Sequence, residues 1–201
     1  LAKANEAVAA VRRAVGGHAG KLSLGIFGPV SGEFLPATLS RFAHAYPQIE
    51  VSLKDISPDE QIAQLENKQI QIAFTINEKG DPEVPHLEQW TVLERDLIVL
   101  LSRFHPLSMK TSIKLTELTQ ETILCLSDGI AVGRHATLAK ELYQKHSVTP
   151  PKLKQVNSFE SMYAFMICNQ GVVLGPKLYK VAPPPGIVER LIELRKDDPK
   201  Y

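Results

Sequence analysis

A strand, a helix and a second strand are predicted in succession between Gly20 and Leu53, and this stretch constrains the fold more than any other. Apolar and polar or small residues alternate at 21–26 and again at 49–53, which is the period of a β-strand. Between the strands, apolar residues follow helical spacing: Leu35, Leu39, Phe42 and Tyr46. The small residues at 28–32 lead into this helix, whose N-terminal N–H groups favour an anion. Ligands of open α/β folds bind at such strand-to-helix loops, so we expect one wall of a small-molecule site here.

The alternation of strand and helix continues beyond this stretch. Ser57 is a good N-cap residue, and Glu60 completes a capping box for a helix through Ile62 and Leu65. Residues 69–76 alternate again and predict a third strand. Because crossover connections are right-handed, the three strands are expected to be parallel.

A second set of strands and helices is predicted from residue 122 onward. Strands are expected at 122–126, 153–156 and 172–174, and helices at 131–146 and 159–168. An extended apolar region near 90–102 separates this set from the first. We therefore expect an α/β protein with two Rossmann-like lobes joined by crossing strands and a ligand between the lobes. The predicted lobe I comprises 20–98 and 176–201, which includes a last strand near Ile187–Leu194, and lobe II comprises 99–175.

The composition argues against nucleic-acid and membrane surfaces. The chain has 23 Lys and Arg against 22 Asp and Glu, and no basic cluster exceeds a pair. No apolar run approaches the roughly 18 residues of a membrane span, and no signal-peptide pattern is present. Cys125 and Cys168 lie in apolar runs, which predicts buried thiols of the kind found in the cytosol. We therefore expect a cytoplasmic protein that contacts no membrane.

Two helical segments suggest self-association. Residues 1–18 are rich in alanine with an apolar stripe, so residues 1–19 are interpreted as the end of a longer linker or dimerisation helix, and otherwise as a helix packed on its own domain. The helix at 34–46 has apolar residues spread around it: Phe34, Ala37, Phe42 and Ala45. This surface predicts a homodimer or homotetramer.

The sequence offers no convincing catalytic set. The six histidines never form a ligand-spaced pair, and paired carboxylates, a Ser/His/Asp set and a phosphate loop with its lysine are not recognisable. We therefore expect neither an enzyme nor a cofactor or metal site.

Six short motifs stand in a specific order along the chain. They are G-K-L-S-L-G at 20–25, L-P-x-x-L-x-x-F-x-x-x-Y-P at 35–47, L-x-x-x-x-I-Q-I-A at 65–73, H-P-L at 105–107, V-N-S at 156–158 and G-V-V-L-G-P at 171–176. In this order and spacing they resemble the effector-binding domain of LysR-type transcriptional regulators. The resemblance implies a type 2 periplasmic-binding-protein-like fold in a bacterial regulator. It also implies that DNA is bound by an N-terminal winged helix-turn-helix domain, which this chain does not contain.

The chain departs from the family pattern in three places. The family usually carries Asp where this chain has Gln71, and an aliphatic residue where it has Gly175. The region after Val181 is also shorter than the family pattern.

The resemblance implies a site for a small effector, expected to be a carboxylate or phosphate, between the two lobes. Carried over to matching positions, the ligand-binding residues are Pro29, Val30, Ser31, Gly32, Ser57, Ile76, Asn77, Ser127, Asp128, Gly129, Ile130, Asn157, Ser158 and Phe159. The simpler interpretation of Ser31, Ser57 and Ser158 is that each only caps a helix.

A free-standing solute-binding protein of the periplasmic type is the alternative function, because it shares the two-lobe architecture. The alanine-rich N-terminal segment favours the regulator, since a transport receptor needs no such helix before its first strand.

Overall fold

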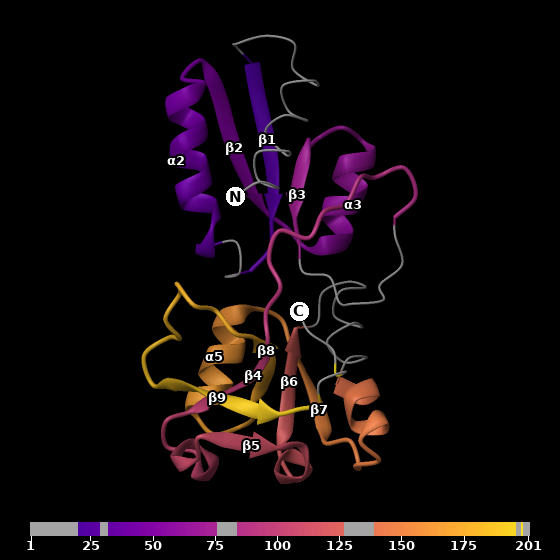
Figure 1. Ribbon diagram of the computed structural model, residues 1–201, viewed down its shortest axis with the longest axis vertical. Helices are drawn as coiled ribbons and strands as arrows, with labels where there is room; N and C mark the ends of the chain where they lie inside the picture. Colours follow the sequence, from indigo (N-terminus) through magenta and orange to yellow (C-terminus); the bar gives the residue numbers. More distant parts are fainter. Residues whose placement is uncertain (1–19, 29–31, 76–83, 127–138, 196–197, 199–201) are drawn as a thin grey trace. The chain divides into compact units, whose positions relative to one another are not determined.

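A computed structural model describes residues 20–28, 32–75, 84–126, 139–195 and 198 (Figure 1). The chain divides into two compact units. The first contains the residues up to Ile76 together with Asp81–Glu94, and the second contains Asn77–Gly80 and Arg95–Tyr201. The predicted linker helix at 1–19 lies outside the described residues.

The first unit is built on a parallel sheet of three strands in the order β2-β1-β3: β1 (Gly20–Ile26), β2 (Ile49–Asp55) and β3 (Ile72–Phe74). The helix α2 (Leu35–Ala45) connects β1 to β2, and α3 (Pro58–Glu66) connects β2 to β3. The predicted strand-helix-strand succession is therefore confirmed. Its apolar residues from β1 and α2 form a shared core: Leu22, Leu24, Leu35 and Phe42.

Helix α3 approaches the sheet closely at Gly25. A Cβ atom on Gly25 would lie 2.8 Å from Ile70 Cδ1 and 3.0 Å from Gln61 Cγ, so a side chain at this position would require these two side chains to shift. The adjacent Gln71 has a structural role of its own, because the Ser23 N–H donates to Gln71 Oε1 at 2.8 Å. This departure from the family pattern thus joins β1 to the start of β3.

The predicted surface of α2 is only partly exposed. Phe42 belongs to the core, and the ring of Phe34 meets that of Phe74 edge-on at 5.1 Å between centroids. Ala37 and Ala45 remain exposed. The apolar residues therefore divide between the unit's own core and its surface.

The second unit contains a four-stranded sheet in the order β5-β9-β4-β8, made of β4 (Leu97–Ser102), β5 (Ser112–Lys114), β8 (Val173–Pro176) and β9 (Ile187–Glu193). Strand β4 runs antiparallel to β8 and β9, and β5 runs parallel to β9. The short 3-10 helices η2 (Pro106–Met109) and η3 (Leu115–Leu118) flank β5. The strand β4 has five buried residues among six, as expected for a central strand.

Two further strands and two helices complete the second unit. β6 (Thr122–Leu126) and β7 (Lys152–Val156) pair in parallel, and one bridge between Ile123 and Val172 joins them to the larger sheet. Residues 139–145 are helical, and α5 (Phe159–Ile167) packs on both sheets. The resulting core contains Leu124, Val156, Met162, Met166, Val173 and Ile187.

The end of the chain corrects one expectation. A last strand exists near the predicted position, but β9 pairs with β4 and β5 in the second unit and does not return to the first. The reason is burial, since Ile187 and Ile192 are 5% and 8% exposed. The assignment of 176–201 to lobe I was therefore wrong, and Leu97 and Ile98 also belong to the second unit.

The cysteines also differ from the expectation. Cys125 is buried, and burial raises the pKa of its thiol to about 11. Cys168 is exposed at the end of α5, so only one of the two predicted buried thiols is buried.

Candidate ligand-binding site

In the first unit, the parallel strands end at one edge of the sheet. Ile26 of β1 pairs with Asp55 of β2 and with Phe74 of β3, so the three carboxyl ends are level. Ser57 follows β2 by two residues and therefore lies at this edge. Its side chain accepts a hydrogen bond from the Glu60 N–H at 3.4 Å, which makes it the N-cap of α3.

The N-terminus of α3 is poorly suited to an anion. Pro58 has no N–H, and the Glu60 N–H is already bonded to Ser57. Asp59 and Glu60 place two acidic side chains in the first turn, where they satisfy the helix dipole. The capping role of Ser57 is thus established, and its role toward a ligand stays a prediction.

Gln61 is a buried polar residue at the same edge that the sequence analysis did not identify. It is 1% exposed, its Nε2 donates to the Phe74 carbonyl at 3.3 Å, and its Oε1 has no hydrogen-bond partner among the described residues. Gln61 therefore ties α3 to the carboxyl end of β3. Helical periodicity alone would have placed it on the face of α3 that meets the sheet, but it does not indicate this bond.

The second unit repeats this arrangement. Leu126 of β6 pairs with Val156 of β7, and Asn157, Ser158 and Phe159 follow directly at the carboxyl edge. Ser158 caps α5, because its Oγ accepts from the Ser161 N–H at 3.1 Å. Phe159 packs against the core of the unit, and Asn157 is exposed. The structure thus brings these three predicted residues together.

The charge around α5 is mixed. Glu160 lies in the first turn, and it raises the pKa of Tyr163, although burial of the phenol is the larger cause. Lys177 follows β8, and its ammonium lies 5.1 Å from the centre of the Tyr179 ring. Burial raises the pKa of the Glu189 carboxyl, and the charge of Lys177 opposes this shift.

Among the remaining predicted residues, the structure describes Gly32. Gly32 is exposed and precedes α2, which begins at Leu35 after Phe34. The others lie outside the described residues: Pro29, Val30, Ser31, Ile76, Asn77, Ser127, Asp128, Gly129 and Ile130.

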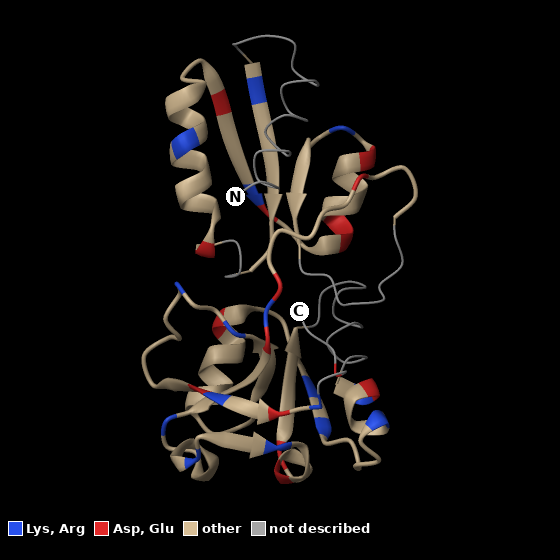
Figure 2. Cartoon of the chain, in the orientation of Figure 1, with Lys and Arg blue, Asp and Glu red and all other residues tan. Residues whose placement is uncertain are grey.

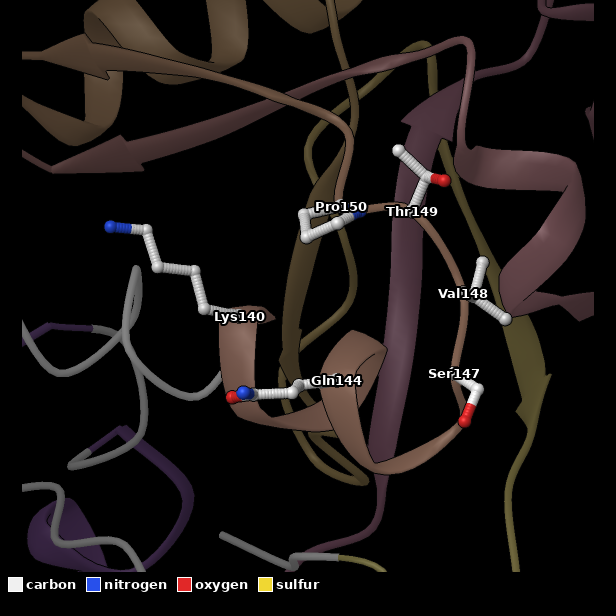
Figure 3. A pocket seen from close by; sticks show the side chains of 6 residues that line it. All are labelled: Lys140, Gln144, Ser147, Val148, Thr149 and Pro150. Carbon is white, nitrogen blue, oxygen red and sulfur yellow. The ribbon is translucent and has the colours of Figure 1, made fainter.

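A hollow in the second unit contains none of the predicted residues (Figure 3). It is lined by Lys140, Gln144, Ser147, Val148, Thr149 and Pro150, at the end of the helix that precedes β7. In Figure 3, Lys140 and Gln144 extend to one side of Pro150, whereas Ser147, Val148 and Thr149 lie on the other. Its polar groups therefore do not converge on one point.

Within the described residues, no three His, Cys, Asp or Glu side chains gather as metal ligands would. None of the helices described is both long enough and apolar enough to traverse a bilayer.

The chain has two units, and in each unit the carboxyl ends of parallel strands lie at one edge. This architecture is that of the periplasmic-binding-protein-like folds. The family model for the LysR substrate binding domain matches residues 16–195, and the chain belongs to this family. Its solved structural relatives include the effector-binding domain of QuiR in complex with shikimate, with a TM-score of 0.72 and 19% identity over 90% of this chain and 86% of that one. The LysR family regulator CbnR is similar with a TM-score of 0.72 and 22% identity, over 98% of this chain and 66% of that one.

Curated relatives are transcriptional regulators. The HTH-type regulator YnfL of Escherichia coli K12 is 25% identical over 183 residues, which cover 90% of this chain and 60% of YnfL. The HTH-type regulator GltR of Bacillus subtilis is 23% identical over 158 residues, covering 79% of this chain and 50% of GltR. The chain thus spans only about half to three fifths of the length of these two relatives.

Proposed function

We propose that the chain is the ligand-sensing and oligomerisation domain of a cytoplasmic LysR-type bacterial transcriptional regulator, and that it catalyses no reaction. The match of the family model over residues 16–195 carries this proposal. The alternative of a free-standing solute-binding protein is not favoured, because the curated relatives are regulators.

The proposed ligand is a small organic anion held at the carboxyl edges of the parallel strands. Related domains support this class, since one was solved with shikimate and one with benzoate. The predicted residues provide short polar side chains and helix N-termini, and both features suit recognition of a carboxylate or phosphate. Ligand binding would change the arrangement of the two units and so act on DNA binding by a domain outside this chain.

Contact with DNA is assigned to that other domain. Figure 2 shows Lys and Arg dispersed among Asp and Glu over the described residues, and the net charge of the chain is +1. A phosphate-binding surface requires clustered cations, and binding that depends on them weakens steeply with salt. We further propose a homodimer or homotetramer, supported by the exposed Ala37 and Ala45 on α2.

Mobility-shift titrations test the proposed function directly. The full-length protein should bind its own promoter as an oligomer, whereas these 201 residues should show no salt-dependent affinity for the same duplex. A full-length protein that ignores every fragment of its own promoter region would refute the regulator. Micromolar binding by the isolated chain that falls with salt would instead place the DNA contact here.

A further inference from the structure

Two side chains on the loop between β4 and β5 are the most exposed large apolar groups in the part of the chain that the structure describes. Phe104 is 69% exposed and Met109 is 89% exposed, whereas His105 and Ser108 between them are buried. A single exposed apolar residue needs no explanation, but neighbouring ones mark contact surfaces. This loop therefore buries polar side chains and presents apolar ones.

The loop is held in place by backbone and side-chain hydrogen bonds. The Ser108 hydroxyl donates to the Arg103 carbonyl at 2.8 Å, and the Lys110 N–H donates to the Leu107 carbonyl at 3.2 Å. The Arg103 N–H donates to the Gly186 carbonyl at 2.8 Å, which joins the loop to the residue before β9. A surface that is already ordered loses little conformational entropy when a partner binds. The two apolar side chains thus project from a fixed support.

The last residue of α5 extends this surface. The Ser102 hydroxyl donates to the Ile167 carbonyl at 3.4 Å and accepts from the Phe104 N–H at 3.2 Å, so Ile167 lies beside the start of the loop. Its side chain is 45% exposed. We call Arg103, Phe104, Met109 and Ile167 the β4 loop surface. Arginine, methionine and aromatic residues are enriched at protein interfaces, so this composition is typical of one.

Arg103 gives the β4 loop surface a positive charge. Its guanidinium lies over the Phe104 ring, 4.6 Å from the ring centre, and no carboxylate of the described residues forms an ion pair with it. The acids on the segment after the loop already have partners, because Glu117 and Glu121 each pair with a basic residue. A guanidinium binds a carboxylate through two parallel hydrogen bonds. This surface is therefore suited to an acid from outside the chain.

A second copy of the chain would not supply that acid. A two-fold contact of the β4 loop surface with itself would bring Arg103 toward Arg103 of the other copy, and like charges across an interface oppose binding. A different protein with an acidic side chain would be attracted instead. The charge thus separates this surface from the oligomer contact proposed for α2.

We propose that the β4 loop surface docks another protein through a segment that carries a carboxylate between aromatic or aliphatic side chains. The carboxylate pairs with Arg103, and the apolar side chains cover Phe104, Met109 and Ile167. This interaction goes beyond the proposed function, because it requires neither an effector nor DNA.

The test uses labelled synthetic peptides of about 14 residues, titrated with the full-length protein and followed by fluorescence anisotropy. One peptide has Leu and Phe at helical spacing and Glu elsewhere, the second has Lys in place of Glu, and the third has Ala in place of Leu and Phe. The first should bind with a Kd of about 100 μM or tighter, and the other two at least about tenfold more weakly.

Variants locate the binding. Arg103→Glu should weaken the acidic apolar peptide by about tenfold or more and strengthen the Lys peptide, and Phe104→Ser and Met109→Ser should each weaken the first by about fivefold. Lys152→Glu is the matched control, because Lys152 is an exposed cation on β7 and its replacement changes the net charge equally. The control should alter the affinity by less than about twofold. All four positions are exposed, so melting temperatures should stay unchanged.

Several results would overturn the docking surface. They are no binding of the acidic apolar peptide at about 1 mM, equal affinity for the Glu and Lys peptides, and a loss with Lys152→Glu as large as that with Arg103→Glu. Sedimentation velocity of Phe104→Ser covers the remaining occupant. A changed oligomeric state would assign this surface to a contact between copies of the chain and so refute the proposal, whereas an unchanged state supports it.

Discussion

Replacement of His105 should destabilise the second unit selectively. The imidazole is 6% exposed, and its Nδ1 accepts a hydrogen bond from the Leu107 N–H at 3.2 Å, which caps η2. Its Nε2 lies 3.2 Å from Glu121 Oε2. The same loop is held by Arg190, whose Nε donates to the Ser108 carbonyl at 2.8 Å. The H-P-L motif of the sequence is therefore a capped turn between β4 and β5.

The magnitude follows from the contacts that His105→Ala removes. Loss of an N-cap costs about 0.5–2 kcal/mol. The partner Glu121 is 28% exposed at its side chain, so loss of this pair adds at most about 1 kcal/mol. The emptied volume beneath the loop adds about 1 kcal/mol more. We expect the free energy of unfolding to fall by about 2–4 kcal/mol, and by about 1 kcal/mol for His105→Asn, since asparagine also caps.

Urea unfolding followed by two probes separates the units. The single tryptophan, Trp90, belongs to the first unit, so its fluorescence reports there, whereas circular dichroism reports on both. His105→Ala should shift the circular dichroism transition and leave the fluorescence midpoint nearly unchanged. Glu121→Gln is the control for the ion pair and should cost less than about 1 kcal/mol. If this control costs as much as His105→Ala, or His105→Ala costs less than about 0.5 kcal/mol, the capping argument is wrong.

Two further predictions concern acid stability and assembly. Burial would raise the pKa of the Asp198 carboxyl, but hydrogen bonds from the Arg195 N–H, His146 and Lys145 together lower it. The ionised carboxylate therefore stabilises the folded state above the pKa of the unfolded chain, and this stabilisation is lost as pH falls below about 4. Asp198→Asn should therefore be less stable at neutral pH and lose less stability on acidification, as thermal melts between pH 7 and 3 will measure; identical profiles would contradict this. Ala45→Arg on the exposed face of α2 should yield monomers in sedimentation velocity, whereas the control Ala63→Arg on the exposed face of α3 should leave the oligomer intact. If the Ala45→Arg variant is still an oligomer, the interface lies elsewhere.

Local patterns predicted the elements of the fold well, because each has a strong period. Leu22, Leu24 and Ile26 alternate in β1, and Leu35 and Phe42 lie on the buried side of α2, as helical spacing requires. Ser57 and Ser158 were predicted as caps from their positions before apolar helices, and both are caps. These features depend only on residues near one another in the sequence.

Long-range pairing was less predictable. The pattern of β9 indicates a strand but carries no information on its partners, which are β4 and β5 of the second unit. Gln61 and Gln71 bond to backbone groups far along the sequence, to Phe74 and to Ser23. Such bonds depend on how α3 and β3 meet the sheet, which no local period records.

The single bridge at Val172 has a mechanical consequence for the second unit. Among the described residues, two backbone hydrogen bonds join the β6-β7 sheet to Val172, the residue before β8 of the larger sheet. The Leu124 N–H donates to the Val172 carbonyl, and the Val172 N–H donates to the Thr122 carbonyl. Gly171 permits this contact by leaving the Thr122 carbonyl uncovered. A change in the angle between the sheets thus disturbs two bonds instead of a full ladder, and the side chains packed under α5 also resist bending. Met162 and Met166 belong to this core, and methionine side chains adapt to a changed space more easily than backbone pairing does.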